Sequence, residues 1–156
     1  PHIYSSHLHA DGDYAKELWI EGPSMTFAPN RYDNDWLERK AQYPKMNGKT
    51  VFKHAVTRMP EVAMEALNAN RFTVPDVDLW IFHQANLRIN YFAAKQMGIE
   101  EDKVFNTIQK FGNTTAATVP IGLDEALKAG KLEPGMLVGI AAFGAGFTWA
   151  SSLVRW

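Results

Sequence analysis

Apolar positions are patterned most clearly over residues 79–97, which read LWIFHQANLRINYFAAKQM. The four residues 79–82 are all apolar, and so short a run predicts a strand buried on both faces. Asn86 is a suitable N-cap for a following helix, whose apolar residues recur at roughly helical spacing. His83 therefore stands between a buried strand and a capped helix, where open α/β sheets place their chemistry.

Patterns before this stretch predict a long helix and a surface excursion. A helical apolar stripe follows the turn signal Asn47-Gly48, and Pro60 within it predicts a kink or an interruption. Residues 23–46 are rich in Pro, Asn and Asp, which favours a long surface excursion with a short helix around 36–40. His7 and His9 alternate near the start, so both would lie on one face of a strand. A metal site would need further ligands, and none is expected.

Patterns after this stretch predict a brief strand over 104–108, a helix to about Ala129 and a terminal hairpin. The helix would begin near the segment Gly112–Ala117, end at Gly130 and turn Val119, Leu123, Ala126 and Leu127 inward. Apolar strands at 136–143 and 147–156 flank the glycine turn 144–146. The order of strands and helices indicates an α/β sheet that forms one domain over residues 1–156.

Composition excludes several function classes. The 156 residues carry a net charge of −1, which gives no general attraction to nucleic acid or to an anionic membrane. No apolar run approaches the roughly 20 residues of a membrane span, and no signal peptide is visible, so a soluble cytoplasmic protein is expected. The chain has no cysteine, which excludes a cysteine nucleophile within it. It begins with Pro1, so we expect that it was processed or is a piece of something longer.

Three polar features would meet at one edge of the predicted sheet: His83, Asn113 and the turn 144–146. A neutral imidazole and a carboxamide both donate hydrogen bonds without carrying net charge. Aimed at one point, they would stabilise a developing oxyanion or enolate, and the turn would offer a backbone N–H to a second oxyanion. Taken singly, a histidine at a strand end is more often structural, and an asparagine after glycine more often makes a turn.

Three motifs together resemble β-ketoacyl-acyl-carrier-protein synthase III. They are His83–Ile89 (HQANLRI), Gly112–Ala117 (GNTTAA) and Ala142–Trp149 (AFGAGFTW), in the order and at the intervals of that family. The resemblance implies the thiolase fold, whose complete chain has two similar halves in five alternating layers. This chain would be the second half, and the complete enzyme would be a homodimer.

The resemblance also implies a reaction and roles for individual residues. An acyl group from acyl-coenzyme A is loaded onto a cysteine, and the enolate formed by decarboxylation of malonyl-carrier protein then attacks it. The substrates are coenzyme A and phosphopantetheine thioesters, with no permanently bound cofactor and no metal. His83 and Asn113 would stabilise the enolate, and the Ala145 N–H would serve the oxyanion of the acyl-cysteine. Phe143 would pack beside the His–Asn pair, and the carrier-protein contact would comprise Gln84, Ala85, Asn86, Leu87 and Arg88.

Two departures from the family pattern limit the resemblance. Ala145 stands where the family often has glycine, so the turn must accept a Cβ atom. The nucleophilic cysteine belongs to the family's first half, so this chain alone should not catalyse the condensation. Two alternatives stay open, namely a related condensing enzyme of polyketide or alkyl-ketone synthesis, and a non-catalytic half that binds carrier protein.

Overall fold

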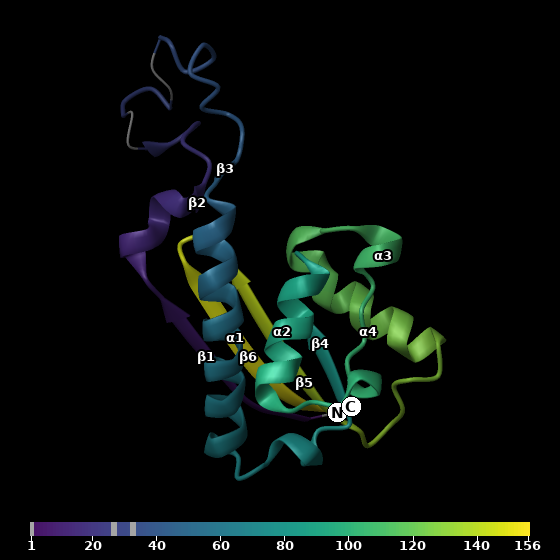
Figure 1. Cartoon of the computed structure of the whole chain (residues 1–156). Helices are drawn as coiled ribbons and strands as arrows, with labels where there is room; N and C mark the ends of the chain where they lie inside the picture. The colour runs from purple at the N-terminus through teal and green to yellow at the C-terminus, as the bar shows by residue number, and fades with distance from the viewer. Residues whose placement is uncertain (1, 26–27, 32–33) are drawn as a thin grey trace.

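The computed structural model describes residues 2–25, 28–31 and 34–156, and its centre is a mixed sheet of four strands (Figure 1). The strands are β1 (His2–Ala10), β4 (Leu79–Phe82), β5 (Leu137–Gly144) and β6 (Thr148–Arg155). Their order is β1-β6-β5-β4. β4 and β5 are parallel, whereas β6 is antiparallel to both β5 and β1. This arrangement confirms the predicted α/β sheet and its terminal hairpin.

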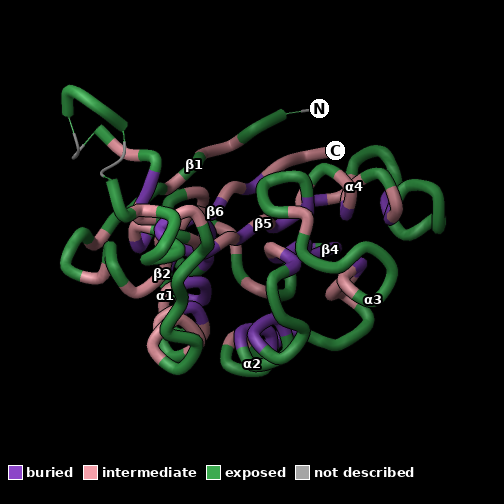
Figure 2. The backbone as a smooth tube through the Cα atoms, turned by 90° about the horizontal axis from the view of Figure 1, so that it is seen from above, coloured by how far each residue is buried: buried purple, intermediate pink, exposed green. Residues whose placement is uncertain are grey.

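Helices cover both faces of this sheet (Figure 2). α1 (Gly48–Ala69) and α2 (Leu87–Met97) pack together on one face, and α4 (Thr118–Lys128) lies against β4 on the other. Shorter elements connect them: η1 (Gly12–Glu17), η3 (Val74–Asp76), η4 (Glu101–Lys103), α3 (Ile108–Phe111) and η5 (Thr115–Ala117). β2 (Leu18–Trp19) and β3 (Lys45–Met46) form a small antiparallel pair near the start of α1, with the excursion between them.

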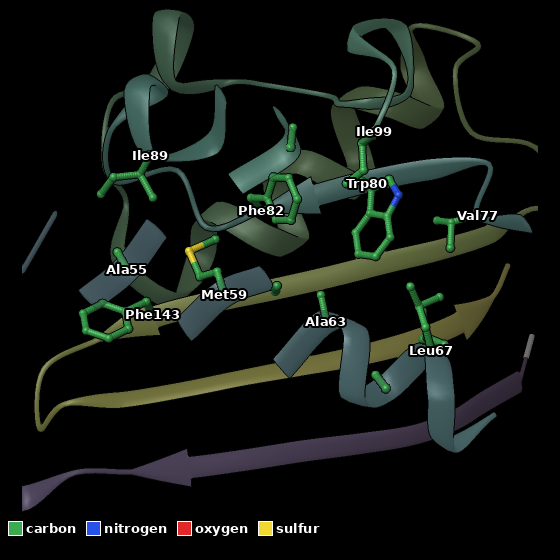
Figure 3. Packing of buried hydrophobic residues seen from close by; sticks show 14 of the residues in the cluster. Ala55, Met59, Ala63, Leu67, Val77, Trp80, Phe82, Ile89, Ile99 and Phe143 are labelled. Atoms are coloured by element: carbon green, nitrogen blue, oxygen red, sulfur yellow. The ribbon is translucent and has the colours of Figure 1, made fainter. Parts of the chain in front are cut away.

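All four residues of β4 are buried, as the unbroken apolar run predicts. Trp80 and Phe82 belong to the core under α1 and α2, together with Met59, Ile89 and other side chains (Figure 3). Leu79 and Ile81 point to the opposite face, into a second cluster with Ala126 of α4. A strand apolar at every position is thus explained by helices on both faces.

The helix after the central strand also forms as predicted. The Asn86 side chain accepts a hydrogen bond from the backbone N–H of Arg88, 2.9 Å away, and so caps α2. Gly98 ends the helix with φ 71°, a left-handed conformation that a residue without Cβ adopts at little cost.

Four local predictions differ from the structure. α1 runs through the buried Pro60 without the interruption that was one of the two predicted outcomes, and the kink stays a prediction. The segment 36–40 forms hydrogen-bonded turns instead of a short helix. The strand expected over 104–108 is reduced to a single bridge between Val104 and Trp80, and Ile108 already begins α3. The buried residues of α4 are Thr118, Gly122 and Ala126, whereas Leu127, predicted to face inward, is 47% exposed.

Replacing Gly139 by alanine tests how tightly β4 and β5 pack. A Cβ atom on Gly139 would lie 2.5 Å from ring carbons of the buried Trp80, so either the ring or the strand must shift. We expect Gly139→Ala to lower the free energy of unfolding by about 1–3 kcal/mol in urea denaturation. Gly48→Ala is the matched control, because nothing lies within 4 Å of its Cβ position. Equal unfolding midpoints for the two variants would contradict this packing.

Candidate active site

His83 follows β4 directly and is fixed to the neighbouring strand through its backbone. Its N–H donates to the carbonyl oxygen of Ala141 on β5, 2.9 Å away, which extends the parallel pairing one residue beyond β4. The imidazole therefore lies at the edge of the sheet where the carboxyl ends of β4 and β5 meet. Its side chain is half-buried.

The imidazole is held from the other side by Thr118, in the first turn of α4. The two side chains are joined by a hydrogen bond of 2.7 Å between His83 Nδ1 and Thr118 Oγ1. One helical turn later, Gly122 allows close approach of α4 to β4, since a Cβ there would lie 2.8 Å from Cγ2 of Ile81. Contact between the helix and the strand thus brings Thr118 to His83.

Burial lowers the pKa of His83, because desolvation disfavours the imidazolium form. The ring is consequently neutral near pH 7, as a donor without net charge requires. Because the folded-state pKa lies below that of the unfolded chain, the unfolded state takes up more protons on acidification. The contribution of His83 to stability therefore falls as the pH drops below the ordinary imidazole value of about 6.5.

Asn113 lies between α3 and η5, in the segment that leads to Thr118. Its Oδ1 accepts a hydrogen bond from the backbone N–H of Thr115, 2.9 Å away. This bond identifies the oxygen of the carboxamide and turns the NH₂ group outward, on an exposed side chain. Gly112, with φ 67°, makes the turn into this segment. Asn113 is thus linked to His83 by hydrogen bonds through Thr115 and Thr118, and the shared catalytic role of Asn113 and His83 stays a prediction.

The turn between β5 and β6 lies at this same edge. The carbonyl oxygen of Ala145 accepts a hydrogen bond from the Thr148 hydroxyl, 3.0 Å away, and Ala145 is exposed. Gly146 carries the positive φ of this turn, 133°, so Ala145 takes an ordinary negative φ despite its Cβ. Among the described residues, no hydrogen bond engages the Ala145 N–H. Its predicted role as an oxyanion donor is therefore sterically possible and stays a prediction.

Phe143 is buried in the core under α1, next to Ala55 and Met59 (Figure 3). Its ring contacts Phe147 at a centroid distance of 4.8 Å and stacks on Trp149 at 6.4 Å. These contacts give Phe143 a packing role close to the turn at 144–146. The predicted position beside the His–Asn pair stays a prediction.

Gln84 has a structural role instead of the predicted carrier-protein contact. Its side chain is fully buried, and its Nε2 donates to the carbonyl oxygen of Phe82 at 2.7 Å. Its Oε1 accepts from the backbone N–H groups of Thr107 and Ile108, at 3.0 and 3.2 Å. These bonds tie the loop that carries His83 to the start of α3. A side chain used in this way cannot reach a partner's surface, so the prediction for Gln84 is corrected.

The four residues after Gln84, from Ala85 to Arg88, are all exposed, as a contact surface requires. The Arg88 guanidinium lies over the ring of Phe52, 5.6 Å from its centroid, which fixes the cation beside the start of α2. Arg88 also borders a groove of about 530 Å³ along the flank of α2, shared with Tyr91 and Lys95. The groove is lined further by Leu87, Asn90, Ala94, Ile99, Glu101, Val104, Asn106 and Gln109.

Two of the three histidines of β1, His7 and His9, bind one carboxylate of α1. His7 Nδ1 and His9 Nε2 lie 2.9 and 2.6 Å from the two carboxylate oxygens of Glu65. These two bonds lower the pKa of Glu65, and the bond to His9 has the larger effect. In the part of the chain that the structure describes, no group of three or more acidic, histidine or cysteine side chains is arranged to hold a metal ion. No helix in the described ranges is long and apolar enough to cross a membrane.

Known proteins share this fold. The structure of 3-oxoacyl-[acyl-carrier-protein] synthase III from Aquifex aeolicus VF5 matches with a TM-score of 0.84 at 37% identity, over 99% of this chain and 44% of that one. The priming β-ketosynthase of the R1128 polyketide pathway matches with 0.83 at 28% identity, over 99% and 45%. A curated relative from Sodalis glossinidius, a β-ketoacyl-[acyl-carrier-protein] synthase III, is 43% identical over 155 residues, which are 99% of this chain and 46% of the relative.

The sheet order and these neighbours define the chain as one half of the duplicated thiolase fold. The family model described as the C-terminal part of 3-oxoacyl-[acyl-carrier-protein] synthase III matches residues 67–156, which is more than half of the chain. The chain therefore belongs to the 3-oxoacyl-[acyl-carrier-protein] synthase III family. It spans slightly less than half the length of the curated relatives that it matches.

Replacing Gln84 by alanine tests its structural role. The change leaves the buried N–H of Thr107 and the N–H of Ile108 without their acceptor, so we expect a loss of about 2–4 kcal/mol in the free energy of unfolding. Gln96→Ala, on the exposed face of α2, is the control and should change stability by less than about 0.5 kcal/mol. A small, equal effect of both changes in urea titrations would exclude this role.

Proposed function

We propose that the complete protein containing this chain is a decarboxylating condensing enzyme, a 3-oxoacyl-acyl-carrier-protein synthase III of fatty acid biosynthesis. In this proposal His83 and Asn113 perform the decarboxylation step. The observation that carries it is the neutral imidazole of His83, held at the carboxyl edge of the sheet by Thr118, with the Asn113 amide on the adjoining segment. Family membership supports the same reaction class.

The mechanism follows from the charge that develops on the substrate. The bond between the malonyl α-carbon and its carboxylate breaks, carbon dioxide leaves, and the electron pair delocalises onto the thioester oxygen as an enolate. His83 and Asn113 donate hydrogen bonds to that oxygen, and neither presents a cation to which the charge would collapse. The enolate carbon then bonds to the acyl carbon of an acyl-cysteine. The Ala145 N–H stabilises the resulting oxyanion before the cysteine thiolate departs.

The substrates of this reaction are an acyl-coenzyme A primer and a malonyl thioester on the phosphopantetheine arm of acyl carrier protein. No permanently bound cofactor is part of the mechanism. The acidic carrier surface and the phosphate on the arm call for a cation at the entrance, and exposed Arg88 suits this role. Ala85, Asn86 and Leu87 complete the proposed contact, without Gln84.

The nucleophilic cysteine must come from outside this sequence, because the chain has none. We place it on the N-terminal half of the fold and propose that this half packs against α4. Leu127 is compatible with this arrangement, since it leaves 47% of its surface exposed on α4. The isolated chain is accordingly inactive in condensation, and the complete enzyme is a cytoplasmic homodimer.

One related reaction has its own support. The priming β-ketosynthase of the R1128 polyketide pathway shares the fold at 28% identity, so the same residues would serve condensation in polyketide synthesis. The two reactions would differ in the acyl primer they accept, which is set by an acyl pocket built mostly by the other half. A comparison of primers of increasing length on the complete protein distinguishes them.

Alanine at His83 or Asn113 tests the proposed chemistry. Each change removes one donor to the enolate oxygen, so we expect decarboxylation of malonyl-carrier protein by the complete protein to slow about 100-fold or more. The release of carbon dioxide measures this step without acyl transfer. His2→Ala and Asn68→Ala are matched controls on exposed positions away from this edge, and both should retain the rate. A normal rate with His83→Ala would overturn the proposed function.

Charge reversal at Arg88 tests the carrier contact. In the complete protein we expect Arg88→Glu to raise KM for malonyl-carrier protein about tenfold, with little change in kcat, because an attractive charge pair becomes repulsive. Lys131→Glu makes the same charge change near the opposite end of β5 and should leave KM unchanged. If both variants raise KM equally, the effect comes from overall charge, and the contact at Arg88 is wrong.

A further inference from the structure

The hydroxyl of Thr118 lies between two acceptors and has one proton to give. Its Oγ1 is 2.7 Å from Nδ1 of His83 and 3.0 Å from the carbonyl oxygen of Thr115. Thr118 is 1% exposed, so water does not compete for this proton. Whichever acceptor receives the hydroxyl proton decides which nitrogen of the neutral imidazole carries the ring proton.

The geometry favours donation to the imidazole. The carbonyl oxygen of Thr115 already accepts the backbone N–H of Thr118 and has no need of a second donor. The distance to Nδ1 is the shorter of the two and is typical of a strong bond from a hydroxyl group. With Nδ1 as the acceptor, the single proton of the neutral ring sits on Nε2.

We propose that Thr118 is a positioning residue, which fixes the tautomer of His83 so that Nε2–H points to the substrate as a donor. This inference rests on the proposed function, in which His83 must donate to an enolate oxygen. A ring protonated on Nδ1 would instead turn a lone pair toward that oxygen and repel it. Removing the hydroxyl removes the preference between the two tautomers, while the close approach of α4 to β4 at Gly122 involves Ile81 and not the Thr118 hydroxyl.

The test uses the complete protein with three variants of matched size or chemistry. Thr118→Val removes the hydroxyl and keeps the shape of the side chain, and Thr118→Ser restores a hydroxyl. Thr57→Val is the control, because the Thr57 hydroxyl donates to the carbonyl oxygen of Lys53 at 3.0 Å within α1, with no imidazole involved. Two readouts are compared: malonyl decarboxylation across pH, and the ¹⁵N chemical shifts of the His83 ring.

We expect Thr118→Val to slow decarboxylation about 10- to 100-fold, the range seen when a metal-bound imidazole loses the partner that orients it. Its His83 spectrum should change from Nε2-protonated to a mixture of tautomers, and its pH profile should shift. Thr118→Ser should retain most of the rate and the wild-type spectrum, and Thr57→Val should change neither readout.

Two results would overturn the inference. One is a ¹⁵N spectrum of the wild-type protein that shows the His83 ring proton on Nδ1. This result does not depend on whether any variant folds. The other is an unchanged rate and pH profile in Thr118→Val. The spectrum does not depend on turnover, so failure of this inference is separable from failure of the proposed function, which a fully active His83→Ala variant would reveal.

Discussion

The structure depends on the burial of β4 on both of its faces. Its four side chains alternate between the core under α1 and α2 and the cluster under α4, so each helical layer is held through the same short strand. Two glycines make this packing possible. Gly139 leaves room for the Trp80 ring beside β5, and Gly122 lets α4 approach Ile81. A strand this tightly enclosed cannot change register without turning its side chains to the wrong faces.

The candidate active site follows from this enclosure. His83 is the next residue after β4, and its place is set by a backbone bond to β5 and a side-chain bond to α4. The loop that continues from it is held by the buried Gln84, which bonds to the start of α3. The reacting edge is therefore built on a strand, two helices and a clamped loop. A rigid support of this kind suits side chains that must keep a hydrogen-bond donor directed at one substrate atom.

Whether a structural feature can be predicted from the sequence depends on how far apart in the chain its interacting residues lie. The buried strand, the helix capped by Asn86 and the terminal hairpin were predictable, because their signals lie within a few residues of each other. The role of Gln84 was not, since its burial depends on α3, more than twenty residues away. The motif predicted a surface contact for the whole run 84–88, yet only the residues after Gln84 are exposed.

The contribution of α4 was also only partly predictable. Helical periodicity turned Ala126 and Leu127 inward. Ala126 is buried and Leu127 is exposed, because the face that meets β4 is set by the close approach at Gly122, which no pattern within the helix reveals. Thr118 was missed as a partner of His83 for the same reason. The one signal in the sequence was a threonine directly after the Gly112–Ala117 motif. Its importance becomes clear only from the structure, where it is buried in the first turn of α4 and bonded to His83.

The most direct test of the central claim is a crystal structure of the complete protein with a malonyl thioester analogue that cannot lose carbon dioxide. We predict that the thioester carbonyl oxygen lies about 3 Å from both His83 Nε2 and Asn113 Nδ2, with His83 Nδ1 still bonded to Thr118. A thioester oxygen bound by other groups, with His83 and Asn113 turned away from it, would contradict the assignment of the decarboxylation step to this chain.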